Sequence, residues 1–230
     1  MTNFNFEGQP EGDWEDRGNL SWSEVDWLKF LQRQDKEIAR FLGFYDQCAS
    51  SATERLDWIA RQMGWDSEDW SVSEISDDEE GEDWNPESDD EHLASDTDPY
   101  TLHRHPVYVV CAGIFLQLRY TLRQILEKEE TAADKLLTWD FSESLGEAEK
   151  HSLMAMQSMD IGDYLLCVVH LKRAMRGINL AMSLLPNLFP PSLDADIFQK
   201  GIVSRLFDLR EVFLRVMNDC REEDRREFRD

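Results

Sequence analysis

The clearest hydrophobic pattern in the chain lies between residues 21 and 64. Apolar residues recur there at alternating spacings of three and four, which places them on one face of a helix. The positions of this seam are Leu28, Leu31, Asp35, Ile38, Leu42, Tyr45, Ala49, Ala52, Leu56, Ile59 and Met63. Ser21, three residues before Glu24, opens the stretch with the pattern of a capping box. We therefore predict one long first helix over 21–64, with Gly43 and the serines at 50–51 as its weak points.

Helical spacing returns in the second half of the chain, residues 99–230, and ends at turn signals such as Gly162, Pro186 and the prolines at 190–191. The predicted elements are helices over 107–130, 142–159 and 163–185, a connector over 132–139, a last helix from Ser192 or Asp194 to about Cys220, and a fraying tail over 221–230. No alternation with period two is long enough for a strand. The predicted fold is an all-α, up-down bundle of about four to six long helices in one domain, preceded by a flexible acidic tail over 1–20.

Charge is distributed very unevenly along the chain. The net charge is −24, yet residues 66–98 hold sixteen acidic side chains and no Lys or Arg, which leaves −8 on the rest. Like charges repel, so residues 65–98 are predicted to form a long acidic disordered loop between the first two helices. A negative surface also repels nucleic-acid phosphates. Direct nucleic-acid binding is therefore disfavoured, and a basic protein is the expected partner.

The acidic loop is also the predicted partner-binding site. Carboxylates keep such a segment extended while tryptophans supply contact area. The residues proposed to bind are Trp70, Asp77, Asp78, Glu79, Glu80, Glu82, Asp83 and Trp84. A loop of this composition also serves as a solubilising spacer, and the sequence leaves both interpretations open. Our first hypothesis is a non-catalytic adaptor, assembly factor or inhibitor that presents the loop to a basic partner.

The sequence shows no pattern typical of catalysis or metal binding. The sequence contains no GxSxG, GxxxxGK[ST], GxGxxG or HExxH motif, and no histidine follows a glutamate by three residues as in di-iron bundles. We therefore predict no catalytic residue, cofactor or metal. His103 and His105 are interpreted as solvent-facing residues at a helix start, with a two-imidazole metal site as the alternative. His170, among apolar neighbours, is interpreted as a core residue or the partner of a neighbouring helix.

Several polar or reactive residues fall at predicted core positions. Asp35 either pairs with a buried arginine or lies in water, and the candidate arginines are Arg119, Arg173 and Arg205. The four cysteines, which show no CxxC spacing, are interpreted as buried free thiols; they are Cys48, Cys111, Cys167 and Cys220.

Two further functions stay open at this point. The long seam and the many tryptophans also suit a structural subunit of a larger complex, joined through exposed helix faces, so oligomerisation is compatible with the sequence. A third hypothesis is an enzyme or ligand-binding bundle with a core site around His170, Cys167 and Cys111.

The segment 147–186 resembles a single tetratricopeptide helical hairpin, in that Gly162-Asp163-Tyr164, Ala174 and Pro186 follow in the order of that family. A second copy at a fixed period is missing, so no family is assigned. The acidic N-terminus does not resemble a signal peptide. The uncharged runs are too short or too rich in proline to cross a membrane. We therefore expect a cytoplasmic protein that does not enter membranes.

Overall fold

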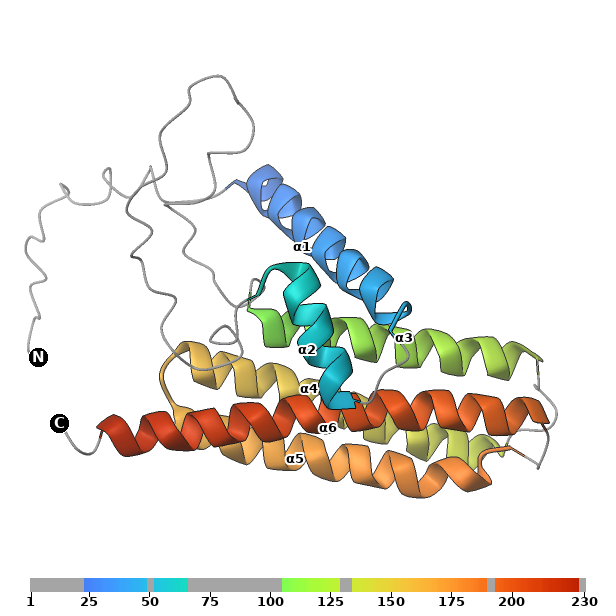
Figure 1. Cartoon of the computed structure of the whole chain (residues 1–230). Helices are drawn as coiled ribbons and strands as arrows, with labels where there is room; N and C mark the ends of the chain where they lie inside the picture. The colour runs from blue at the N-terminus through green and yellow to red at the C-terminus, as the bar shows by residue number, and fades with distance from the viewer. Residues whose placement is uncertain (1–22, 49–51, 66–104, 129–133, 190–192, 228–230) are drawn as a thin grey trace, which may run out of the picture.

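A computed structural model gives the fold (Figure 1) and describes residues 23–48, 52–65, 105–128, 134–189 and 193–227. The helices are α1 (Glu24–Tyr45), α2 (Ala52–Met63), α3 (Pro106–Lys128), α4 (Lys135–Asp160), α5 (Tyr164–Leu184) and α6 (Leu193–Glu227), with a short 3-10 turn, η4 (Leu185–Asn187), after α5. Strands do not occur among the residues that the structure describes. The predicted all-α, up-down bundle is therefore confirmed.

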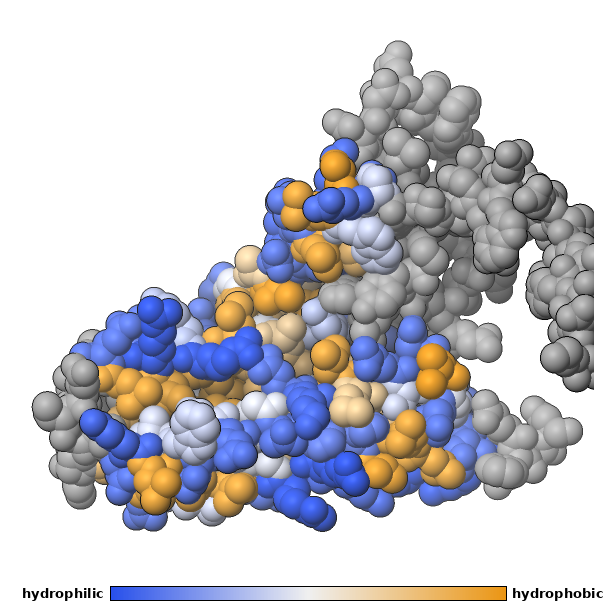
Figure 2. All heavy atoms as spheres, turned by 180° about the vertical axis from the view of Figure 1, so that it is seen from behind, coloured by the Kyte–Doolittle hydropathy of each residue, from blue (hydrophilic) through white to orange (hydrophobic). Residues whose placement is uncertain are grey.

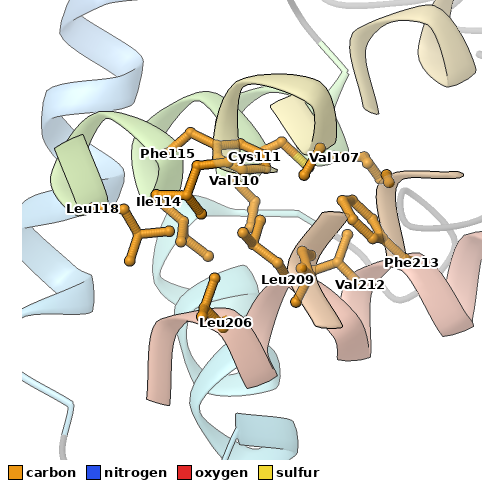
Figure 3. Packing of buried hydrophobic residues seen from close by; sticks show 14 of the residues in the cluster. Val107, Val110, Cys111, Ile114, Phe115, Leu118, Leu206, Leu209, Val212 and Phe213 are labelled. Carbon is orange, nitrogen blue, oxygen red and sulfur yellow. The ribbon is translucent and has the colours of Figure 1, made fainter. Parts of the chain in front are cut away.

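The body of the molecule consists of α3, α4, α5 and α6, which alternate in direction along the long axis (Figure 1). Figure 3 shows how α3 and α6 meet through apolar side chains. The residues labelled there are Val107, Val110, Cys111, Ile114, Phe115 and Leu118 of α3, and Leu206, Leu209, Val212 and Phe213 of α6, all of them buried. A helix that is apolar on most sides, such as α3, buries several of its faces against neighbouring helices.

The α4–α5 hairpin packs most closely of all, because small residues line its interface. A Cβ atom added at Gly177 would lie 2.7 Å from the backbone oxygen of Ser144 and 3.0 Å from the Cβ of Ala148. The turn between the two helices passes through Gly162, whose φ of 79° favours glycine. The hairpin predicted around this turn is therefore present, and the backbones of its two helices approach closely at Gly177 and Ser144.

The prediction of one continuous first helix is wrong. The structure has two helices, α1 ending at Tyr45 and α2 beginning at Ala52. The break lets each helix bury apolar residues on a different partner, because α1 packs on α3 while α2 packs on α6. The capping box also lies two residues later than predicted, between Ser23 and Asp26.

The face of α1 that becomes buried is not the predicted seam. Leu28 and Leu31 of the seam are 55% and 43% exposed. The buried residues of α1 are Phe30, Gln34, Phe41 and Tyr45. Most of these precede a seam position by one residue, which is a rotation of about 100° around the helix. The reason is tertiary: α1 leaves the body at an angle (Figure 1), and the ring of Phe41 sits directly over Gly113 of α3.

The remaining predictions concern the connector, the charged C-terminal tail and the two acidic segments. The connector predicted over 132–139 belongs to α4, which begins at Lys135 after the N-cap Asp134. The charged tail does not fray at residue 221, since α6 continues to Glu227. The acidic tail over 1–20 and the acidic loop over 66–98 lie outside the described residues. Among the residues described, no helix combines the length and apolar character that a membrane span requires.

Candidate functional site

A solvent-facing groove of about 700 Å³ runs between α3 and α4. Its floor is apolar and consists of Phe115, Leu122, Leu126 and Leu145, of which all but Leu126 are buried. On the α4 side, Gly146 lines the groove without a side chain, and a Cβ added there would meet no atom within 4 Å. The groove therefore exists where helix spacing and a missing side chain leave the core open to solvent.

Ion pairs border this apolar floor. Arg119 of α3 pairs with Glu149 of α4 across the groove, and Arg123 pairs with Glu127 one turn apart on α3. The side chains of Arg119, Arg123 and Glu127 are mostly exposed and that of Glu149 is partly exposed, and exposed pairs contribute only about 0–1 kcal/mol. A ligand can therefore displace them at little cost. The carboxylates are already engaged by arginines, so the rim holds no free acid–base pair.

The dimensions of the groove suit a helix. Its lining on α3 runs from Phe115 to Glu127, which at about 1.5 Å per residue spans roughly 18 Å, or three helical turns. Figure 2 views the molecule from behind, on the side where α4 lies, and shows hydrophobic side chains exposed among hydrophilic ones along the body. A rigid pair of long helices thus presents a short apolar channel at the surface.

A second polar cluster lies inside the molecule, where α1, α2 and α6 meet. Asp208 is fully buried, and its Oδ2 accepts hydrogen bonds from the hydroxyl of Tyr45 and from Arg55 Nη1, the latter at 2.6 Å. Arg55 also donates to Ser204 Oγ at 3.1 Å. Burial raises the pKa of Asp208, while Tyr45 and Arg55 oppose that rise. The sequence does not indicate that Asp208 is buried, because an amphipathic pattern predicts one buried apolar face for α6. The contact of α6 with α2 buries a further face, on which Asp208 lies.

The histidine prediction for His170 is supported by the structure, which places it against a neighbouring helix. His170 Nδ1 of α5 lies 3.1 Å from His151 Nδ1 of α4. Burial, His170 and Arg173 lower the pKa of His151. His105 instead accepts a hydrogen bond from the backbone N–H of Val107 at the start of α3.

The cysteines are free thiols, and Cys111, Cys167 and Cys220 are buried as predicted. The prediction is wrong for Cys48, which is only partly buried. Cys220 Sγ lies 3.5 Å from Cys167 Sγ, and this contact together with burial raises the pKa of Cys167. Burial likewise raises the pKa of Cys111. The third hypothesis grouped His170 with Cys167 and Cys111, but the contacts found join His170 to His151 and Cys167 to Cys220 instead. Within the described ranges, no three metal-ligating side chains come together.

The remaining predicted residues divide into two groups. Asp35 is exposed, which favours the wet alternative over a buried ion pair; Arg119 binds Glu149, and Arg205 donates to Gln117. The predicted partner-binding residues and His103 lie outside the described residues, namely Trp70, Asp77, Asp78, Glu79, Glu80, Glu82, Asp83, Trp84 and His103.

Comparison of this chain with known proteins gives no match. No family model matches it, and neither a curated protein nor a solved structure does so.

Proposed function

We propose that this chain is a non-catalytic interaction protein whose α3–α4 groove receives an amphipathic helix of a basic partner. The observation that carries the proposal is the apolar, solvent-facing floor of the groove, bounded by weak surface ion pairs. Helix-in-groove recognition uses apolar anchors at positions i, i+3 or i+4, and i+7. Three turns of groove match that spacing.

The charge of the chain supports a basic partner. The net charge of −24, with sixteen carboxylates in residues 66–98, creates a field that attracts cations over a Debye length of about 10 Å at moderate salt. In this proposal the acidic segment raises the rate of encounter and the groove supplies the specific contact. Such a division of roles makes binding weaken with salt without being abolished by it.

The glycines of the helices provide a matched pair of test variants. Gly146→Leu places a side chain in the groove, while Gly43→Leu makes the same change on α1; at both sites an added Cβ meets no atom within 4 Å. Both replacements raise helix propensity by a similar amount, about 0.5–1 kcal/mol. A difference between the two variants therefore reports on the groove rather than on folding.

The test measures binding of a synthetic amphipathic helix, with leucine on one face and lysine on the other, to the full chain by fluorescence anisotropy. We expect Gly146→Leu to weaken binding at least about tenfold and Gly43→Leu to leave it unchanged. Changing the six carboxylates of residues 77–83 to amides should reduce the salt dependence. Absence of binding, equal binding of a scrambled peptide, or equal effects of both glycine variants would overturn the proposal.

A second candidate function has its own observation. Val25, Leu28 and Leu31 form an exposed apolar row on α1, each more than 40% exposed. This row favours a structural subunit that joins a larger complex through a helix face. Sedimentation velocity over a wide concentration range tests this function. Self-association that Leu28→Lys abolishes would support a structural subunit that assembles with copies of itself. A monomer at every concentration would contradict self-assembly through this row.

A further inference from the structure

The side chains of His151 on α4 and His170 on α5 make a direct polar contact across the α4–α5 hairpin. Their Nδ1 atoms are 3.1 Å apart, with ring centroids at 5.3 Å and ring planes inclined by 31°. His170 is 8% exposed, and the side chain of His151 is 12% exposed. Two imidazoles thus meet head to head at the edge of the closest helix interface in the fold.

The head-to-head arrangement suits a shared proton rather than a metal ion. The centroid separation shows that both nitrogens lie near the line joining the two rings, so their lone pairs point at each other. A metal needs both lone pairs to converge on a point beside that line. A proton between the nitrogens satisfies both, with one ring donating and the other accepting.

We propose that the His151–His170 pair is a proton-operated latch, which holds α4 against α5 at neutral pH and opens in acid. The pair tolerates one added proton, because a charged ring still donates to a neutral one. A second proton turns both Nδ1 atoms into donors and brings two positive charges 3.1 Å apart. The hydrogen bond is then lost and replaced by repulsion.

The surrounding charges favour opening over a relaxed doubly charged state. Lys150 on α4 and Arg173 on α5 disfavour a charged His151, while Glu147, whose Oε2 lies 3.7 Å from His151 Nε2, favours it. Together with burial, the balance lowers the pKa of His151.

Two arginines on the neighbouring helices have partners other than the histidines. On the α3 side, Arg119 is occupied by Glu149. On the α6 side, Arg210 bonds to Asn179 of α5.

The sign of the pH effect follows from linkage. A histidine whose pKa is lowered by folding binds fewer protons in the folded chain than in the unfolded chain. Stability therefore falls as the pH drops below the unfolded value of about 6.5, and the loss is complete below the folded value. This inference concerns the hairpin alone and does not rest on the groove.

The first experiment follows the imidazole signals of His151 and His170 in the full chain by NMR between pH 8 and pH 4. We expect two separated steps, with the lower one below the ordinary histidine range. A single step in which both rings titrate together near pH 6.5 would overturn the proposal. This measurement uses the unaltered chain, so it does not depend on whether a variant folds.

The second experiment compares urea unfolding of the natural chain with that of the double variant His151→Gln and His170→Gln, at pH 7.5 and pH 5. Glutamine keeps a polar contact between the helices and does not titrate. Between these two pH values the unfolding constant of the natural chain should rise more than that of the variant, by up to about tenfold for each unit by which folding lowers the pKa of His151. An identical pH dependence of the two proteins contradicts the latch.

Discussion

Replacement of Asp208 by leucine should sharply destabilise the protein, although no predicted site includes this residue. Asp208 is fully buried and accepts hydrogen bonds from Tyr45 of α1 and Arg55 of α2. The side chain of Arg55 is itself only 11% exposed. Leucine is of suitable size for the site, but it removes the carboxylate that pairs with the buried guanidinium of Arg55.

The magnitude follows from the contacts that are lost. A hydrogen bond to a charged group contributes about 1.5–3 kcal/mol, and Asp208 accepts two of them. The sum agrees with the roughly 3–5 kcal/mol expected when one partner of a buried ion pair is removed. Most domains are stable by only about 5–15 kcal/mol. The single change should therefore remove about a fifth or more of the total free energy of unfolding.

The assay is urea unfolding of four proteins: the natural chain, Asp208→Leu, Arg55→Met and the double variant. The double variant should recover much of the loss, since two apolar residues replace an ion pair with no charge left buried. If the double variant costs as much as the two single variants added together, the two residues are not coupled and the reasoning fails.

A neighbouring ion pair between the same two helices supplies the control. Arg215 of α6 binds Asp57 of α2, whose side chain is 47% exposed. Because solvent screens this pair, Asp57→Leu should cost about 1 kcal/mol or less. An equal loss for Asp57→Leu and Asp208→Leu would show that burial does not determine the cost.

Two further predictions concern packing. Gly177→Ala should destabilise the protein by about 1–3 kcal/mol, because the added Cβ would lie 2.7 Å from a backbone oxygen of α4. Gly146→Ala should instead stabilise it by about 0.5–1 kcal/mol, because the added Cβ meets no atom within 4 Å and alanine has the higher helix propensity. Thermal unfolding of both variants checks the opposite signs. Among the cysteines, Cys48 should react first with iodoacetamide at pH 8, because it is only partly buried. The buried thiols of Cys111, Cys167 and Cys220 should react only on unfolding, because the reagent cannot reach them, and burial also raises the pKa of Cys111 and Cys167. Mass spectrometry of the labelled native chain would contradict this if Cys167 were modified as fast as Cys48.

Local patterns in the sequence are enough to predict an all-α fold and the positions of most turns and helix ends. Helical spacing identified the four helices of the body, because a 3.6-residue period is a local property of the chain. Gly162 and Pro186 located the turn after α4 and the end of α5 for the same reason, since each restricts the backbone at its own position. The concentration of carboxylates in residues 66–98 is likewise a property of the sequence alone.

Which helix faces contact one another depends on how the helices pack. The seam of α1 is regular in sequence, yet Phe41 is fully buried while its seam neighbour Leu42 is only partly buried, because Phe41 lies directly over Gly113 of α3. The contacts of Asp208 with Arg55 and of His151 with His170 join residues 153 and 19 positions apart, as no local pattern can indicate. The groove beside Gly146 is also a consequence of helix spacing, since a surface is hollowed by the distance between two helices rather than by the residues of either one.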